Sequence, residues 1–341
     1  MLPLVSVIIA TRNRRGLLER TLDALAAQEW PRDRYEVIVA DNGSTDGTRA
    51  FVEALSRQPG ACAIRYVHVA APGKSIAVNE ALARARGDLL AFTDDDVRPD
   101  PAWLAQLARA FEDRGVDFVA GRILPDWEAP PPRWMSPALF GVLAIPDGGS
   151  ARLPIRSGVN DHIMPIGANM AVRAAVVRRI GGLRVDLGKL EGTLRTGEDH
   201  EFFLRLLRYG CRGLYEPAAV VVHRVPADRL RRSYFRRWLY QNGRDVATLQ
   251  RDYPTTATRL LGVPRYLWRE GAAAALGTAG ATLRGDATQR LAASLRVIWI
   301  AGYVRQSWRG RSLRAAAMAA ADRLRRTGQA RRGAQRVART S

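Results

Sequence analysis

Three consecutive carboxylates, Asp94, Asp95 and Asp96, follow an apolar run from Leu89 to Phe92 that is typical of a buried strand. Adjacent like charges repel one another, and removing them from water is costly unless a partner compensates them. A hard divalent cation, Mn²⁺ or Mg²⁺, is such a partner, because it prefers carboxylate oxygens and can carry a substrate diphosphate. An acidic turn after a strand is also commonly a solvated loop. The features around the triplet must therefore decide between a metal site and a solvated loop.

Two further groups could do chemistry. Glu198 and Asp199 are adjacent acids at a predicted helix start, where a carboxylate can act as a general base for an acceptor hydroxyl. Acids at that position are also simply favoured by the helix dipole. His223 ends the apolar strand pattern that begins at Ala218, so it is a candidate metal ligand, although a lone histidine is more often a core or surface residue.

Polar loops follow other predicted strands and offer contacts to a nucleoside. Thr11 and its adjoining backbone can meet a base edge, and Asp41 can accept a hydrogen bond from a base or a ribose hydroxyl. The cluster from Asp41 to Gly47 is equally typical of a tight turn.

The elements that must position these residues alternate between strand and helix. Apolar, β-branched runs at residues 4–10, 35–40, 63–69 and 89–94 are separated by helical patterns. Such alternation predicts a mostly parallel sheet with right-handed crossovers, whose ligands bind beyond the carboxyl ends of the strands. The polar loops at Thr11, Asp41, Gly73 and Asp94 all lie at that edge.

The second half of this region is less regular. Residues 116–120 are predicted to form a strand, and the five prolines between Pro125 and Pro137 predict an irregular loop over the site. Helices are predicted after residue 172 and from Gly197 to Gly210.

The composition is that of a globular protein, with 341 residues, 47% hydrophobic and 25% charged. Cys62 and Cys211 have no metal-type spacing and fit a reducing compartment. We expect no signal peptide and no spanning helix, because the best apolar stretch, Leu291 to Val304, is interrupted by Arg296.

The net charge of +20 is concentrated at the end of the chain. Residues 227–341 contain 24 arginines and six acids, whereas the first 226 residues are nearly neutral. Arginines there alternate with aromatic residues, including Trp238, Trp268, Trp299 and Trp308. This pattern fits a helical subdomain with a solvated face, a nucleic-acid binder, or a surface that attaches to anionic lipid.

These patterns divide the chain into three regions. Residues 1–225 form the α/β domain, with a nucleotide-binding half at 1–121 and an acceptor half at 122–225. Residues 226–322 form a basic helical extension, and residues 323–341, with seven arginines and no acid, are predicted to be disordered.

Six segments of the first 225 residues, taken in order, resemble glycosyltransferase family 2. They are VSVIIATRNR, VIVADNGSTDGT, GKSIAVNEALARARGD, LLAFTDDDVRPDPAWL, GANMAVRAAVVRRIGG and GEDHEFFLRLLRYG. The resemblance implies the GT-A fold, a nucleotide-sugar donor, a divalent metal ion and inversion at the anomeric carbon.

The resemblance also implies roles for single residues. The Asp94–Asp96 triplet occupies the DxD position, in which Asp96 is the metal ligand and Asp94 and Asp95 contact the nucleotide-sugar. Asp199 matches the catalytic base, with Glu198 as its neighbour in the motif. His223 matches a further metal ligand. The remaining nucleotide-sugar contacts are Thr11, Asn13, Asp41, Asn42 and Lys74.

The sequence therefore predicts a metal-dependent inverting glycosyltransferase for cell-envelope or polysaccharide synthesis. We expect a UDP-, GDP- or dTDP-sugar donor, a glycan or lipid-linked acceptor, and a cytoplasmic location with peripheral contact to the inner face of the membrane. The alternatives are a nucleotidyltransferase on a similar fold and a nucleic-acid-binding protein that uses the arginine-rich third. The neutral first two thirds argue against nucleic acid as the main partner.

Overall fold

The computed structural model describes residues 2–58, 62–190 and 192–309. The chain forms two compact units that divide between Trp238 and Leu239, within helix α7 (Arg232–Asp252). The predicted subdivision at residues 121 and 225 stays a prediction. The tail predicted to be disordered, residues 323–341, lies outside the described residues.

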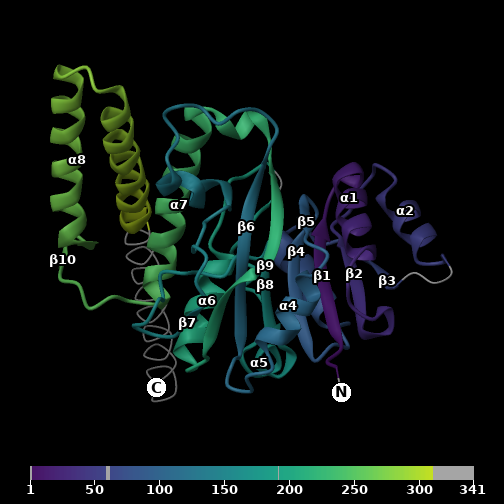
Figure 1. The fold of residues 1–341 in the computed structure, drawn as a ribbon. Coiled ribbons are helices and arrows are strands. Elements are labelled where there is room, and N and C mark those ends of the chain that lie inside the picture. Colours follow the sequence, from purple (N-terminus) through teal and green to yellow (C-terminus); the bar gives the residue numbers. More distant parts are fainter. Residues whose placement is uncertain (1, 59–61, 191, 310–341) are drawn as a thin grey trace, which may run out of the picture. The chain divides into compact units, whose positions relative to one another are not determined.

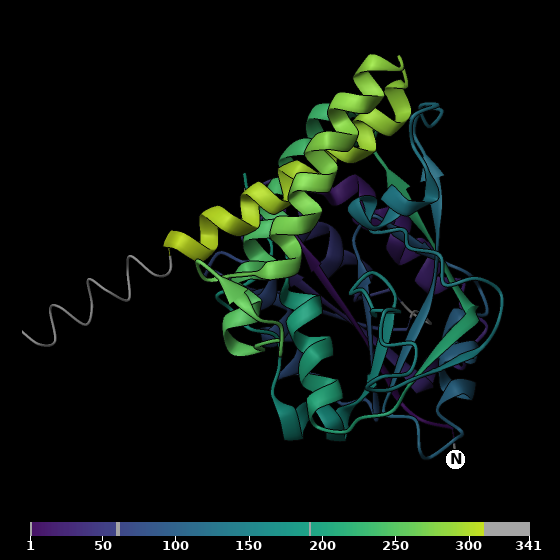
Figure 2. The same cartoon turned by 90° about the vertical axis from the view of Figure 1, so that its left-hand side faces the viewer.

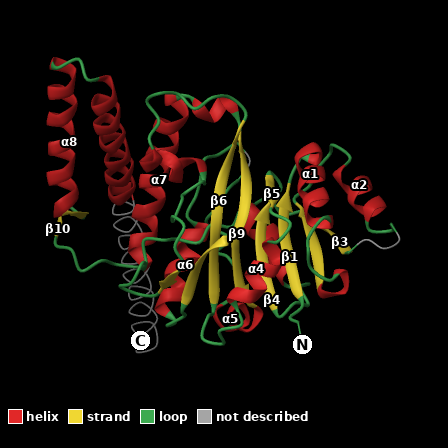
Figure 3. Cartoon of the chain, in the orientation of Figure 1, coloured by secondary structure: helices red, strands yellow, loops and turns green. Residues whose placement is uncertain are grey.

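A sheet of nine strands forms the centre of the first unit (Figures 1 and 3). The strands are β1 (Val5–Thr11), β2 (Tyr35–Asp41), β3 (Ala63–His68), β4 (Leu89–Asp94), β5 (Val97–Pro99), β6 (Phe118–Trp127), β7 (Leu153–Ile155), β8 (Met170–Arg173) and β9 (Gly213–Val225). Their order is β3-β2-β1-β4-β8-β6-β9-β5, and β7 pairs with β9. The first four strands are mutually parallel, and β8 is antiparallel to both of its neighbours. The predicted mostly parallel α/β sheet is therefore confirmed.

Helices cover both faces of this sheet. They are α1 (Arg15–Ala26), α2 (Thr48–Leu55), α3 (Lys74–Leu82), α4 (Trp103–Ala110), α5 (Ala174–Ile180) and α6 (Glu198–Arg208), with 3₁₀ turns η1 (Arg32–Arg34), η2 (Pro137–Leu143) and η3 (Ala227–Leu230). One apolar core joins α3, α5 and α6 to sheet residues such as Phe92, Phe118 and Met170. Right-handed crossovers place α1 and α2 on the opposite face, where Leu18 and Val52 are buried.

The register of the parallel strands aligns their polar ends. Thr11 of β1 lies opposite Asp41 of β2, and the preceding residue, Ala10, lies opposite Asp94 of β4. Asp41 in turn lies opposite His68 at the end of β3. The predicted convergence of these loops at one edge of the sheet is confirmed.

Two strands are longer than the sequence predicts. Strand β6 runs on through Pro125 to Trp127, so the predicted irregular loop begins later than expected. The last residues of β6 pair with β9 alone, which leaves the other side of Pro125 without the ladder hydrogen bonds that proline cannot donate. Strand β9 begins at Gly213 and contains a bulge, which interrupts the apolar pattern that marks its second half.

A buried amide holds this bulge. Asn169 Nδ2 donates hydrogen bonds to the carbonyl oxygens of Arg122 and Ala219, both at 2.8 Å. Asn169 Oδ1 accepts one from Trp103 Nε1 at 2.8 Å. Because Asn169 is completely buried, its amide satisfies polar groups of β6, β9 and α4 that water cannot reach.

The second unit is helical. After α7 come a small hairpin, β10 (Arg259–Leu260) with β11 (Val263–Pro264), then α8 (Arg265–Leu283) and a helix over residues 287–309. Figure 2 shows the last two helices side by side. Trp299 stacks on Tyr303, and its Nε1 donates to Asn242 Oδ1 at 2.8 Å.

Two features of this unit are relevant to the predicted attachment to a membrane surface. Trp268 and Trp299 pack against the core of the second unit, so they serve packing rather than an interfacial belt. The exposed apolar surface comes from leucines, of which Leu276 is 74% and Leu283 89% exposed, and from Tyr266 and Trp308. In the described ranges, no helix combines the length and apolar character needed to cross a bilayer.

We predict that Asn169→Ala lowers the free energy of unfolding by about 3 kcal/mol, because it leaves two buried carbonyls and an indole N–H without partners. Urea denaturation followed by tryptophan fluorescence measures the change. Gln58→Ala, at an exposed position, is the control and should change the value by less than about 0.5 kcal/mol. Equal effects of the two substitutions would contradict the role given to Asn169.

Candidate active site

The acidic triplet lies where β4 turns into β5. Asp94 is the last residue of β4, and Asp95 and Asp96 form the turn before Val97. Asp95 and Asp96 are only 3% and 9% exposed. The triplet is therefore not a solvated loop, and its charges need partners inside the protein.

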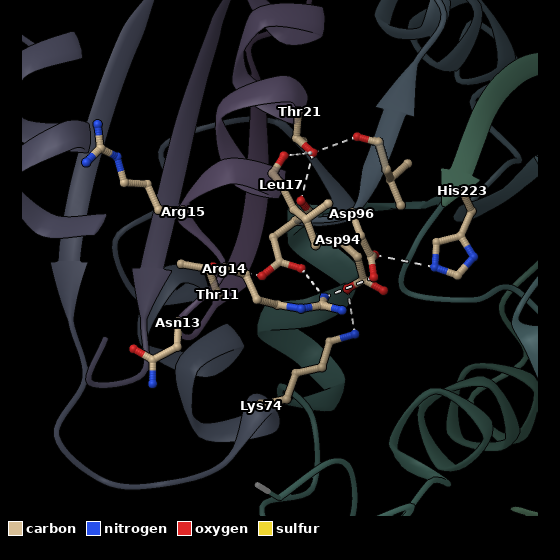
Figure 4. Close-up of polar contacts among 12 residues, drawn as sticks. Thr11, Asn13, Arg14, Arg15, Leu17, Thr21, Lys74, Asp94, Asp96 and His223 are labelled. Carbon is tan, nitrogen blue, oxygen red and sulfur yellow. Dashed lines mark hydrogen bonds and ion pairs between the residues drawn. The ribbon is translucent and has the colours of Figure 1, made fainter. Parts of the chain in front are cut away.

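Arg14 is the partner of two of these carboxylates. Its Nη1 lies 2.5 Å from Asp95 Oδ1 and 2.9 Å from Asp96 Oδ2 (Figure 4). Thr11 Oγ1 donates a hydrogen bond to the second oxygen of Asp95 at 2.7 Å. Burial raises the pKa of Asp95 to about 6 despite the nearby guanidinium. The sequence analysis assigned this compensation to a metal ion and missed Arg14, which the arginine-rich loop after β1 could have suggested.

Lys74 is the partner of the third carboxylate. Its Nζ lies 2.6 Å from Asp94 Oδ1. Burial alone would lower the pKa of Lys74, but the carboxylates of Asp94, Asp199 and Glu198 raise it above its usual value. One ammonium group therefore pairs with the end of β4 and interacts electrostatically with the acids at the start of α6.

The acid pair begins α6, as predicted. Gly197, with φ of 107°, precedes the helix in a backbone conformation that favours glycine. Asp199 Oδ2 accepts a hydrogen bond from the Gly167 N–H at 3.0 Å. Burial raises the pKa of Asp199, against the opposing effect of Lys74. Burial and the charge of Asp199 raise the pKa of Glu198 to about 7.

His223 lies beside the triplet because β5 pairs with β9. The antiparallel register sets Val97 opposite His223, so His223 Nε2 is 3.4 Å from Asp96 Oδ1. Despite burial, His223 and Arg14 hold the pKa of Asp96 well below its usual range. Strand β5 was not predicted, so the sequence made His223 a candidate metal ligand only through its place at the end of an apolar strand and through the family resemblance.

Asp96 and His223 fit a divalent ion in part. Two neighbouring ligands of an octahedral Mg²⁺ or Mn²⁺ are roughly 3 Å apart, which is close to the 3.4 Å between their facing atoms. In residues 2–58, 62–190 and 192–309, no group of three or more His, Cys, Asp or Glu side chains could hold a metal ion. The two residues therefore suit an ion that takes its other ligands from substrate phosphates and water, as Mg²⁺ commonly does.

The predicted nucleoside contacts connect the loops to one another. Both polar atoms of the Asn42 side-chain amide bond to the backbone. Its Nδ2 donates to the carbonyl oxygens of Val69 and Ala71, and its Oδ1 accepts from the Gly73 N–H. Asp41 accepts from Ser44 N and Tyr66 Oη, each through a different oxygen.

Asn13 ties the β1 loop to the β2 loop. Its Oδ1 accepts a hydrogen bond from the Thr45 N–H at 2.7 Å, and its own N–H donates to Ser44 Oγ at 2.9 Å. The contacts of Thr11, Asn13, Asp41 and Asn42 thus shape the edge of the site, and direct contact with a nucleoside stays a prediction.

Two further cations, which the sequence did not single out, interact electrostatically with Asp96. The charge of Arg229 acts on Asp96 and helps to lower its pKa. The pKa of Lys189 is lowered, first by burial and then by the charges of Arg229, Arg14 and Lys74. Several cations crowded at one edge of the sheet form a favourable environment for an anion such as a diphosphate.

The chain is similar in sequence to known glycosyltransferases. The family model described as "Glycosyl transferase family 2" matches residues 6–180. The chain is 32% identical to the succinoglycan biosynthesis protein ExoM of Rhizobium meliloti over 233 residues, which are 67% of this chain and 70% of ExoM. It is 34% identical to glycosyltransferase AglE of Haloferax volcanii over 122 residues, which are 36% of this chain and 40% of AglE.

A solved structure has a similar fold. The mannosyltransferase PcManGT from Pyrobaculum calidifontis, in complex with GDP-Man and Mn²⁺, superimposes with a TM-score of 0.63 at 23% identity. The match covers 90% of this chain and 88% of that protein.

Proposed function

Because this chain belongs to glycosyl transferase family 2, we propose that it is an inverting, metal-dependent enzyme. It transfers a sugar from a nucleotide-diphosphate sugar to an acceptor hydroxyl. Family membership favours this reaction over nucleotidyl transfer. The donor class is further supported by the GDP-Man bound to PcManGT, a protein of similar fold.

A single contact network carries the proposal. Lys74 pairs with Asp94 at 2.6 Å, and its charge also acts on Asp199 and Glu198. These interactions support one site that contains both the triplet predicted to bind the donor and the pair predicted to supply the base. Proximity of donor and base is what a direct displacement requires.

Asp199 is the proposed base. Its Oδ2 is oriented by the Gly167 N–H, so the carboxylate is held in place when an acceptor hydroxyl approaches. Asp199 takes the proton from that hydroxyl as the oxygen forms its bond to the anomeric carbon and the bond to the diphosphate breaks. One displacement of this kind inverts the anomeric centre.

Asp96 and His223 are the proposed metal ligands. A Mn²⁺ or Mg²⁺ ion bound there would stabilise the negative charge that develops on the leaving diphosphate. The cations Lys189 and Arg229 lie around Asp96 and would hold the same diphosphate. We assign the nucleoside and ribose to the edge formed by Thr11, Asn13, Asp41, Asn42 and the triplet.

The acceptor is proposed to be a glycan or a lipid-linked saccharide of the cell envelope. Support comes from ExoM, a relative named for succinoglycan biosynthesis. The second unit would attach the enzyme to the anionic inner face of the membrane. The exposed Leu276 and Leu283 lie about two turns apart in α8, and Arg284 and Arg290 follow at exposed positions.

The first prediction tests the donor and the metal. We expect UDP-, GDP- or dTDP-sugars to raise the melting temperature in the presence of Mn²⁺, with one nucleotide preferred, and EDTA to abolish turnover. Asp96→Asn should remove the Mn²⁺-dependent part of the stabilisation. Full turnover in EDTA would contradict the metal requirement while leaving the glycosyltransferase assignment intact.

The second prediction concerns the base. Asp199→Asn should keep donor affinity and lose about 10²–10⁴-fold in kcat, because the acceptor proton then has no base. The pKa of Asp199 is raised, and the base works only when ionised. The acid limb of kcat/KM should therefore lie well above about pH 4, the ordinary range for aspartate, and activity should fall as the pH drops through it. An inactive Glu198→Gln beside an active Asp199→Asn would reverse the assignment.

The third prediction concerns the membrane. The enzyme should sediment with phosphatidylglycerol vesicles but not with phosphatidylcholine vesicles, and high salt should release it. Leu276→Ser combined with Leu283→Ser should weaken this binding. Val185→Ser, an exposed apolar position of the first unit, should not. Equal binding to both kinds of vesicle would rule out an electrostatic attachment.

A further inference from the structure

One nitrogen atom of Arg14 contacts two carboxylates. Nη1 lies 2.5 Å from Asp95 Oδ1 and 2.9 Å from Asp96 Oδ2, while Asp96 Oδ1 faces His223 Nε2. The guanidinium is therefore paired with the carboxylate that the proposed function assigns to the metal ion (Figure 4). A bound cation and Arg14 would be close neighbours of like charge.

Arg14 has a route away from this position. The side chains of Asp95 and Asp96 are 5% and 6% exposed, but that of Arg14 is 30% exposed. Arg14 precedes α1, where its carbonyl accepts hydrogen bonds from the N–H groups of Leu17 and Leu18, so its backbone is anchored. It also lines an open pocket of about 430 Å³, whose other charged lining residues are Asp46, Arg15, Arg20 and Arg224. The side chain can therefore turn outward without unfolding an element.

We propose that Arg14 is a built-in competitor of the divalent cation for Asp96. The inference rests on the proposed metal site. With Arg14 in place, one of the two negative charges that would attract the cation is already compensated, so the cation alone binds weakly. A donor diphosphate adds negative charge and offers Arg14 a new partner, so the cation and the donor bind together. Arg14 thereby makes metal binding depend on the nucleotide.

A purely structural role for Arg14 predicts the opposite result. If the guanidinium only holds the turn in shape, its loss disorders Asp96 and weakens binding of the cation. If it competes, its loss strengthens binding of the cation in the absence of nucleotide. The sign of the change in affinity therefore separates the two roles.

The experiment measures Mn²⁺ binding by electron paramagnetic resonance of the free ion, with no activity required. Without nucleotide, Arg14→Gln should bind Mn²⁺ about tenfold or more tightly than the wild type. Arg15→Gln is the matched control, because Arg15 is the next residue in the chain and its side chain lies over the Phe51 ring. This variant should bind Mn²⁺ with the affinity of the wild type. Adding UDP, GDP or dTDP should reduce the difference between Arg14→Gln and the wild type.

A second pair of variants tests the inference even if Arg14→Gln does not fold. Arg14→Gln leaves the buried Asp95 without its cation, whereas the double variant Arg14→Gln with Asp95→Asn removes both charges. The double variant should bind Mn²⁺ more tightly than Asp95→Asn alone. Unchanged or weaker binding after loss of Arg14, in a wild type that binds Mn²⁺ with nucleotide, overturns this inference only. A wild type that binds no Mn²⁺ with any of the three nucleotides overturns the proposed metal site as well.

Discussion

The burial of adjacent carboxylates at the end of β4 is the constraint on which the rest of the site depends. Asp95 and Asp96 are almost completely removed from water, so their charges are tolerable only beside cations and hydrogen-bond donors. The loop after β1 supplies Arg14 and the Thr11 hydroxyl, and β9 supplies His223. Strand pairing fixes the position of each of these groups, so the compensation of the buried carboxylates depends on the pairing of β1 with β4 and of β5 with β9.

Lys74 extends this network to the other half of the site. It pairs with Asp94, and its charge acts on the acid pair at the start of α6. The electrostatic state of the proposed base is therefore coupled to that of the proposed donor site. A donor that displaces Lys74 from Asp94 would change the field at Asp199.

The described part of the second unit is stabilised by close packing of helices rather than by a network of buried charges. Glycines allow its helices to approach closely, since a Cβ on Gly302 would come within 2.1 Å of the Tyr240 carbonyl oxygen. Trp268 and Trp299 are used for this packing, whereas the exposed apolar surface combines leucines with Tyr266 and Trp308. Composition alone suggested an aromatic interface with the membrane, but Trp268, Trp299 and Tyr303 pack in or against the core of the unit.

The sequence alone determined the alternation of strand and helix, the mostly parallel sheet, the edge at which Thr11, Asp41 and Asp94 meet, and the family, because these follow from local periodicity and ordered motifs. It did not reveal strand β5, the bulge of β9 or the pairing of Arg14 with the triplet. Strand β5 has three residues, too few for a pattern, and it exists because β9 lies beside it. Arg14 was one arginine among many until the sheet register brought its loop next to Asp95. Tertiary structure decides which residues far apart in the chain become partners, because such pairs leave no local pattern in the sequence. Only folding determines which charged groups are buried together, away from water.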